Sequence, residues 1–323
     1  EHEHTRAHVS LFDCSHMGEY RVLGYDAIAA FDAEIITDTS KVPVGRCRYG
    51  AILNDNGGIV DDIITFRMAD DELFIVTNAG PLEHVTDRLC SRHPGIQHLS
   101  FETAKIDVQG PKSRECVMRA GFKEAETLKY FNCIWTTWRG HAVLLSRTGY
   151  TGELGYELFM PNELAAEAWN VFLAMDGVKA AGLGARDTLR TEVGYCLSGQ
   201  DFDESCSPLE SGMESYIAWD TEFVGKSALE SQRDQGGYRV LVPIKTDSRR
   251  APRHGMEIKR GGEVVGVVTS GTFGPSVGHG VGLARVDRAV SRSGTKLSAG
   301  PKDLEVEVTE TPIYKNGTCR MKI

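Results

Sequence analysis

Short segments in which apolar and polar residues alternate, or in which β-branched residues follow one another, recur along the chain between Gly, Asn, Asp or Pro. This pattern is typical of β-strands. It predicts strands at YRVLGY, ELFIVTNA, HAVLLSRT, YELFMP, YRVLVPI, EVVGVVTSG, VGLARV and LEVEV. A further strand is predicted from Ile59 to Phe66, because turn-forming residues from Asn54 to Gly58 precede it.

Three segments instead space their apolar residues as a helix does. They are Pro81–Cys90, a segment that Asn162 caps and that runs to Met175, and the shorter Ala185–Val193. The segment Ser291–Asp303 is predicted to be a polar loop. Because strands dominate and no regular alternation of strand and helix appears, we expect a mostly antiparallel α+β protein.

Two adjacent aspartates interrupt the predicted strand from Ile59 to Phe66. Side chains alternate along a strand, so Asp61 and Asp62 fall on opposite faces, both of which are otherwise mostly apolar. Burying a charge costs free energy unless it is paired or used. The spacing alone supports two interpretations equally: one aspartate is solvated at an edge and the other binds backbone groups, or one has a functional task.

The segment Ser146–Phe159 reads SRTGYTGELGYELF and is rich in glycine and aromatic residues. Taken by itself it indicates a glycine-rich hairpin. It is also compatible with a backbone that lets a flat ring approach. In that case Glu157 can accept two parallel N–H bonds from a heterocycle.

The other candidate motifs carry less weight. GLGARD lacks the full dinucleotide-binding pattern, and a helix start at Arg186 usually lies on the surface, although it can place a cation in a cleft. His16 and Met17 are of types that are usually structural. The early HEH segment has no matching ligand set, so no metal site is predicted, and neither a nucleophile elbow nor a P-loop is present.

Composition narrows the possible partners and compartments. The 323 residues, 41% of them hydrophobic, suffice for two or three domains. The net charge of −9 without a dominant basic patch disfavours nucleic acid and anionic membranes as partners. The longest apolar runs, such as Val264–Val268, are strand-sized, which predicts no transmembrane helix. Eight scattered cysteines without C-x-x-C indicate a reducing compartment, the cytoplasm or, in a eukaryote, the mitochondrial matrix.

Six ordered motifs resemble one family closely. LFDCSHMGE, LNDNGGIVDDII, VTNAG, SRTGYTGELGYELF, GLGARDTLRTEVGYCLSGQD and GEVVGVVTSGTFGPSVGHGVGLARV follow the order and spacing of glycine-cleavage T-proteins, which are tetrahydrofolate-dependent aminomethyltransferases. The resemblance spans almost the whole chain and lacks only a short stretch ahead of Glu1. The same scaffold serves folate-dependent demethylases and the folate domains of sarcosine and dimethylglycine oxidases.

The resemblance implies three domains in a cloverleaf around a central folate-binding hole. Domain one would be discontinuous, comprising residues 1–17 and 104–193 without the family's N-terminal part. Domain two would comprise residues 18–103. Domain three, residues 194–323, would be a jelly-roll-like β-barrel.

The resemblance also implies the site residues. Asp61 matches the aspartate that faces the reactive folate nitrogens, Glu157 the glutamate that binds the pterin, and Arg186 a ligand-binding arginine. Asp62 is expected to face the domain interior or a turn whose backbone N–H groups bind it. The remaining ligand-binding positions are Met17, Asn78, Tyr150, Arg253 and Tyr314.

The implied reaction moves a methylene from an aminomethyl-lipoyl H-protein to tetrahydrofolate and releases ammonia, with neither a metal nor a protein nucleophile. Two alternatives stay open. One keeps tetrahydrofolate but takes the one-carbon unit from a small N-, O- or S-methylated substrate. The other is a folate-binding module without turnover, which intact DD, GYTGE and GARD motifs disfavour.

Overall fold

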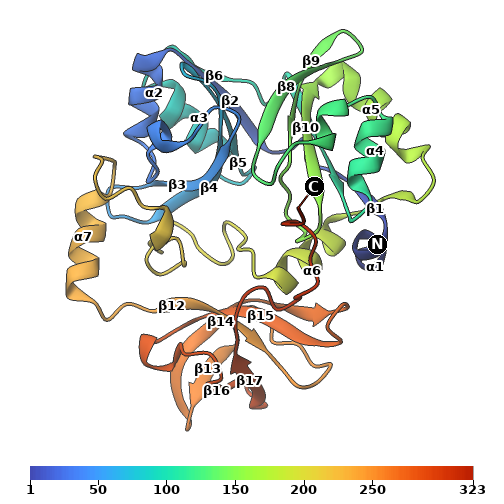
Figure 1. The fold of residues 1–323 in the computed structure, drawn as a ribbon. Helices are drawn as coiled ribbons and strands as arrows, with labels where there is room; N and C mark the ends of the chain where they lie inside the picture. Colours follow the sequence, from blue (N-terminus) through green and yellow to red (C-terminus); the bar gives the residue numbers. More distant parts are fainter. Residues whose placement is uncertain (323) are drawn as a thin grey trace.

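A computed structural model describes residues 1–322 and contains three separate sheets (Figure 1). The first sheet has six strands in the order β11 (Val178–Ala180), β1 (Val9–Asp13), β7 (Thr103–Gln109), β10 (Gly155–Pro161), β9 (His141–Ser146) and β8 (Cys133–Trp138). The second has five strands in the order β3 (Cys47–Leu53), β4 (Ile59–Ala69), β5 (Glu72–Thr77), β2 (Gly18–Leu23) and β6 (Ile96–His98).

The third sheet closes on itself as a six-stranded barrel. Its strands follow the order β12 (Val240–Lys245), β15 (His279–Val286), β14 (Glu263–Gly274), β13 (Glu257–Arg260), β16 (Lys296–Ala299) and β17 (Leu304–Val308). Among the named strands of residues 1–322, every pair except β1–β11 is antiparallel. The prediction of a mostly antiparallel α+β fold with a C-terminal barrel is therefore confirmed.

Seven α-helices accompany the sheets. Their bounds are α1 (His2–Ala7), α2 (Tyr25–Asp32), α3 (Leu82–Cys90), α4 (Ser113–Arg119), α5 (Ala165–Leu173), α6 (Leu183–Val193) and α7 (Lys226–Gln235). Across residues 1–322, none of these helices is long and apolar enough to cross a membrane.

Two local predictions are wrong. The segment predicted as a polar loop, Ser291–Asp303, contains strand β16, whose alternation of buried Leu297 and Ala299 with polar neighbours is only four residues long. Asn162 does not cap a helix, because its side-chain amide donates to the Phe101 carbonyl at 2.6 Å. A 3₁₀ turn begins at Asn162, and α5 follows it at Ala165.

The whole second sheet lies in sequence between two paired strands of the first sheet. Strands β1 and β7 are antiparallel neighbours, with Leu11 opposite Val108, yet residues 14–102 separate them in the chain. The two sheets stand beside each other, and the barrel lies below both (Figure 1). The segment after α6 runs between the two sheets above and the barrel below (Figure 1). Phe74 of the second sheet packs against Phe159 of the first, with ring centres 5.3 Å apart, so a face of one sheet meets a face of the other. The predicted domain limits stay a prediction.

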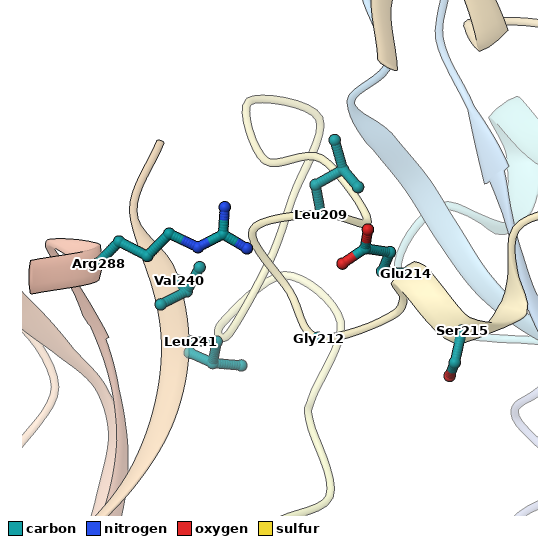
Figure 2. A pocket seen from close by; sticks show the side chains of 7 residues that line it. All are labelled: Leu209, Gly212, Glu214, Ser215, Val240, Leu241 and Arg288. Atoms are coloured by element: carbon teal, nitrogen blue, oxygen red, sulfur yellow. The ribbon is translucent and has the colours of Figure 1, made fainter. Parts of the chain in front are cut away.

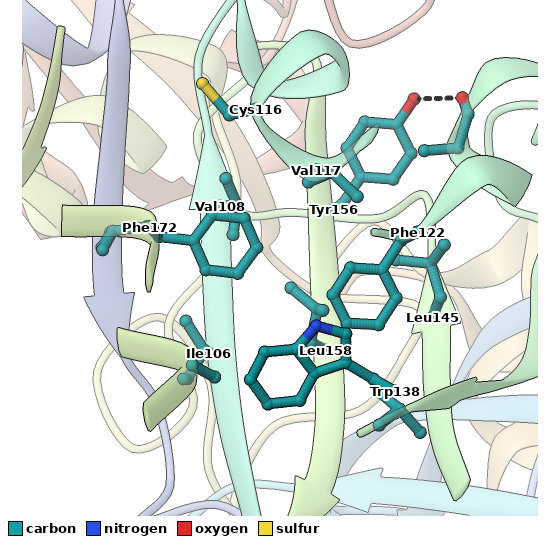
Figure 3. Packing of buried hydrophobic residues seen from close by; sticks show 14 of the residues in the cluster. Ile106, Val108, Cys116, Val117, Phe122, Trp138, Leu145, Tyr156, Leu158 and Phe172 are labelled. Atoms are coloured by element: carbon teal, nitrogen blue, oxygen red, sulfur yellow. Dashed lines mark hydrogen bonds between the residues drawn. The ribbon is translucent and has the colours of Figure 1, made fainter. Parts of the chain in front are cut away.

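The first sheet has one apolar face and one face that is polar at its centre. On β7, Ile106 and Val108 enter a large core beneath α4 and α5 (Figure 3). Lys105 and Asp107 alternate with them and therefore project from the opposite face. Both charged side chains are buried nonetheless, so this face must contain their partners.

The C-terminal segment returns from the barrel to the first sheet. The backbone N–H of Cys319 donates to the Gly152 carbonyl at 3.1 Å. The Thr318 hydroxyl accepts from the backbone N–H of Leu154 at 2.8 Å. The C-terminal segment therefore fixes the loop between β9 and β10, which carries the glycine-rich motif.

Candidate active site

The two aspartates lie on β4 next to a β-bulge. Leu53 of β3 pairs with Ile59, but Ile52 pairs with Asp61, so one extra residue sits on β4 between them. A bulge re-aims side chains and breaks strict alternation. Asp61 and Asp62 themselves stay in regular register with Ile52 and Ala51, yet they reach a shared partner, which alternation alone did not predict.

That shared partner is Asn78, which follows β5. Its side-chain amide nitrogen donates to Asp61 Oδ1 at 2.8 Å and to Asp62 Oδ1 at 2.7 Å. An amide nitrogen carries two hydrogens, so one can go to each carboxylate. The backbone N–H of Asn78 also donates to Asp61 Oδ2 at 2.8 Å.

Each aspartate has one further side-chain donor. Ser198 Oγ donates to Asp61 Oδ1 at 3.1 Å, and the Tyr49 hydroxyl donates to Asp62 Oδ2 at 2.9 Å. The prediction that a turn supplies backbone N–H donors to Asp62 is therefore wrong. It is Asp61 that accepts a backbone N–H and is fully buried, whereas Asp62 is partly exposed.

The aspartate pair contains two acids and no cation. Across residues 1–322, neither Asp61 nor Asp62 forms an ion pair with a basic side chain. Burial and the adjacent Asp62 charge raise the pKa of Asp61 to about 7, against the bonds from Asn78 and Ser198. Burial raises the pKa of Asp62 to about 6, against the bonds from Tyr49 and Asn78. The pair can therefore hold one proton near neutral pH.

Glu157 belongs to a second, charge-balanced group on the polar face of the first sheet. It lies on β10 directly opposite Asp107 of β7. Lys105 Nζ lies 2.6 Å from Asp107 Oδ1 and 3.2 Å from Glu157 Oε1. Arg186 Nη1, from α6, lies 3.1 Å from Asp107 Oδ2. Two acids and two cations thus form one buried network.

Tyr150 and the segment after α6 connect the two groups. The Arg186 guanidinium carbon lies 4.7 Å from the centre of the Tyr150 ring, and the Tyr150 hydroxyl donates to the Cys196 carbonyl. Two residues later, Ser198 reaches Asp61. Polar contacts therefore run continuously from the first sheet to the second.

A buried arginine fixes this connecting segment to the barrel. Arg190 of α6 binds Asp201 at 2.7 Å and Ser270 of β14 at 2.9 Å. Asp201 Oδ2 also accepts from the backbone N–H of Leu197 at 2.9 Å. The position of Ser198 against Asp61 is thereby fixed relative to α6 and the barrel.

Of the remaining predicted residues, Met17 packs beside Phe12, Cys14 and α6 residues at the edge of the site. Arg253 is exposed on the barrel, with Nη1 3.5 Å from the Gly271 carbonyl. Tyr314 lies beneath Arg6, 4.1 Å from ring centre to guanidinium carbon. The contacts described for Arg253 and Tyr314 do not join them to either acidic group.

Several polar partners of the predicted residues were not predicted from the sequence, among them Lys105, Asp107, Ser198 and Tyr49. A usable signal existed for the first two: in KIDVQ, alternation places both charges on one face of a strand whose other face is apolar. Ser198 and Tyr49 carry no local signal, because only the fold brings them to the aspartates.

A separate surface cleft lies between the barrel and the segment that follows Cys206 (Figure 2). Arg288 and Glu214 point toward each other across it. Leu209, Val240 and Leu241 give it an apolar wall. None of the predicted site residues lines this cleft.

Comparisons with known proteins match both parts of the chain to one family. Residues 1–221 match the model of the GCVT N-terminal domain, and residues 239–315 match the glycine cleavage T-protein C-terminal barrel domain. The chain is 36% identical to an aminomethyltransferase of Halothermothrix orenii over 97% of this chain and 90% of that protein. It is 37% identical to one of Cutibacterium acnes over 98% and 90%, respectively.

A solved structure gives the same result for the fold. The glycine cleavage system aminomethyltransferase T from Bartonella henselae superposes with a TM-score of 0.91 at 30% sequence identity. The superposition covers 98% of this chain and 89% of that one.

Proposed function

Because this chain belongs to the glycine-cleavage T-protein family of aminomethyltransferases, we propose that it moves a methylene from an aminomethyl-lipoyl H-protein to tetrahydrofolate and releases ammonia. The observation that carries this proposal is the pair of buried acidic groups joined through Arg186, Tyr150 and Ser198. One group suits ring recognition and the other suits proton handling.

The Glu157 group fits the pterin ring of tetrahydrofolate. That ring presents a ring N–H beside an amino group, which matches the two oxygens of a carboxylate. Thr148 takes one acceptor position on Oε2, and Lys105 faces Oε1. Each oxygen has two acceptor positions, so one stays available on each.

The Asp61–Asp62 pair fits the demands of the transfer. Tetrahydrofolate supplies two nucleophilic amines, N5 and N10, to the carbon. As the carbon–nitrogen and carbon–sulfur bonds of the donor break, the two amine protons pass to ammonia and to the lipoyl thiol. An ionised Asp61 stabilises positive charge near N5, and the pair holds a proton between the transfers.

The cysteines support the expected compartment. Cys14, Cys47, Cys116, Cys133 and Cys206 are buried, and all eight cysteines are free thiols. Free thiols persist where the surroundings are reducing, as in the cytoplasm.

The decisive assay mixes purified protein and tetrahydrofolate with one of two donors, either aminomethyl-lipoyl H-protein or a panel of methylated amines. The proposal predicts that ammonia is released only when the H-protein is the donor. Methyltetrahydrofolate formed from a methylated donor would contradict it and favour the demethylase alternative. Binding of tetrahydrofolate without turnover of any donor would favour the folate-binding module.

A further inference from the structure

The network around Glu157 contains two charged residues, Lys105 and Asp107, to which the transfer chemistry gives no direct task. Lys105 is 2% exposed and Asp107 is fully buried. Burying an ion pair is often no more stabilising than an apolar pair of the same size. A buried pair that touches both Glu157 and Arg186 therefore invites a functional explanation.

Geometry shows how Lys105 divides its contacts. Its ammonium donates to Asp107 Oδ1 at 2.6 Å, a short charge-assisted hydrogen bond. It stands 3.2 Å from Glu157 Oε1. The lysine is therefore drawn to Asp107 and offers Glu157 mainly a nearby positive charge.

Asp107 is also the link to Arg186. Its second oxygen, Oδ2, accepts from Arg186 Nη1 at 3.1 Å and from the Cys14 thiol at 3.5 Å. Burial favours the neutral form of Asp107, but the Lys105 and Arg186 charges outweigh it and lower its pKa. Asp107 therefore stays ionised and holds both cations.

We propose that Lys105 and Asp107 are positioning residues for tetrahydrofolate: Asp107 holds the Lys105 ammonium away from full contact with Glu157, and Lys105 keeps Glu157 ionised with acceptor positions open. This inference rests on the proposed use of tetrahydrofolate. It predicts that each single variant weakens tetrahydrofolate binding, but for a different reason. Without Lys105, Asp107 and Glu157 face each other as like charges. Without Asp107, Lys105 turns to Glu157 and competes with the ligand.

The pH dependence separates positioning from packing. Burial raises the pKa of Glu157, and Lys105 opposes that rise. In Lys105→Met the pKa should rise further, so tetrahydrofolate affinity should fall at neutral pH and return as pH increases. The other groups that face this network are Arg186, Asp107 and Tyr150 together with Cys14, His16, Glu19 and Cys47. Burial and the Arg186 charge lower the pKa of His16, so its imidazole is neutral at neutral and alkaline pH.

Only Glu19 among these groups needs a control variant. Burial raises the pKa of Cys14 to about 12, so that thiol stays neutral. The Cys47 thiol likewise has a pKa raised by burial. Burial raises the pKa of Glu19 to about 8, so Glu19 would titrate during the experiment. All chains compared should therefore carry Glu19→Gln.

The test measures the dissociation constant of tetrahydrofolate by anaerobic calorimetry from acid to alkaline pH. Lys105→Met should weaken neutral-pH binding by about tenfold or more, as expected for a charge-assisted hydrogen bond. Asp107→Asn should weaken binding at every pH. The double variant Lys105→Met, Asp107→Asn should recover part of the loss, because it removes one charge of each sign.

Matched variants guard against misfolding. Lys105→Arg keeps the cation and should keep the pH profile of the unaltered chain. Lys179→Met, at an exposed lysine of the same sheet, should leave both affinity and profile unchanged. Circular dichroism and melting temperature identify any variant that fails to fold, and the Lys105→Arg profile then decides alone: a shifted profile overturns the inference.

Two further results would overturn the inference in different ways. Failure of the unaltered protein to bind tetrahydrofolate would overturn the proposed function together with this inference. Normal binding by the unaltered protein, with single-variant losses that add in the double variant and an unshifted pH profile, would overturn this inference alone.

Discussion

The aspartate pair on β4, in which Asp61 is buried and Asp62 partly exposed, and the buried acid pair of Asp107 and Glu157 have different partners. Asp61 and Asp62 share the neutral amide of Asn78. Asp107 and Glu157 share the ammonium of Lys105. Because the Asn78 amide is neutral, the first pair can take up a proton, whereas the charged Lys105 ammonium keeps Asp107 ionised.

The difference indicates a division of labour. A site that exchanges protons needs groups whose pKa lies near the working pH. A site that orients a ligand needs acceptors whose charge and position stay constant. The aspartate pair meets the first requirement. In the other group, Lys105 and Arg186 hold Asp107 ionised, and Lys105 opposes the rise that burial causes in the pKa of Glu157.

The largest expected effect comes from Asp61→Asn. The change is nearly isosteric and removes the charge proposed to lie near N5. We expect turnover to fall by about 10²–10³, the usual cost of losing one preorganised electrostatic contact. Steady-state kinetics should show this fall in kcat at an unreduced melting temperature. Near-normal turnover in Asp61→Asn would remove the aspartate from the chemistry.

The second prediction concerns stability and pH. The folded pKa of Asp61, about 7, lies above its ordinary value of 3.8. Between these values the folded state binds more protons than the unfolded state, so raising the pH lowers the free energy of unfolding. Asp61→Asn should remove this loss of stability at high pH, which is at most roughly 4 kcal/mol, because one pKa unit corresponds to about 1.4 kcal/mol.

Urea unfolding of both chains below and above neutral pH measures this loss. The variant should gain stability over the unaltered chain as the pH rises. A constant difference between the two chains would show that Asp61 does not titrate in this range.

Glu157→Gln should weaken tetrahydrofolate binding and leave kcat at saturation little changed. Glutamine keeps one acceptor oxygen and loses the charge, which costs about 1.5–3 kcal/mol per charge-assisted hydrogen bond. Calorimetry gives the affinity. The matched control is Glu163→Gln, at an exposed glutamate in the 3₁₀ turn that follows β10. Unchanged affinity would place Glu157 outside the binding site.

The smallest effect is expected at Arg253, on the exposed barrel surface. If the H-protein carrier presents acidic groups there, Arg253→Glu should raise its KM about two- to fivefold, as for an exposed charge pair. The KM for tetrahydrofolate should stay constant. Arg260→Glu, also exposed on the barrel, controls for charge alone. Equal changes in both KM values would reject carrier docking at Arg253.

Local pattern predicted the elements that carry the candidate site. The turn at Asn54–Gly58 and the strand after it follow from residue type, and β4 begins at Ile59 as expected. The helix predicted at Ala185–Val193 is α6, which begins two residues earlier. Both elements obey rules that act within about ten residues of sequence.

Long-range contacts could not be predicted in the same way. Glu157 meets Asp107 because β7 and β10 pair across fifty residues of chain. Asn78 donates to both aspartates although it lies on the chain after a different strand, β5, sixteen residues beyond Asp62. For Tyr314, too, no local pattern indicates that its backbone N–H donates to the Glu192 carbonyl and that its ring lies against Arg6; its place in the folate site stays a prediction.

The pH dependence of kcat in the unaltered chain and in Asp62→Asn tests most directly whether the aspartates act as one proton-sharing pair. If ionised Asp61 is the active form, kcat should rise with pH and level off above the pKa of about 7. Removing the Asp62 charge should lower the Asp61 pKa and move this rise to lower pH. The same inflection in both chains would contradict the account.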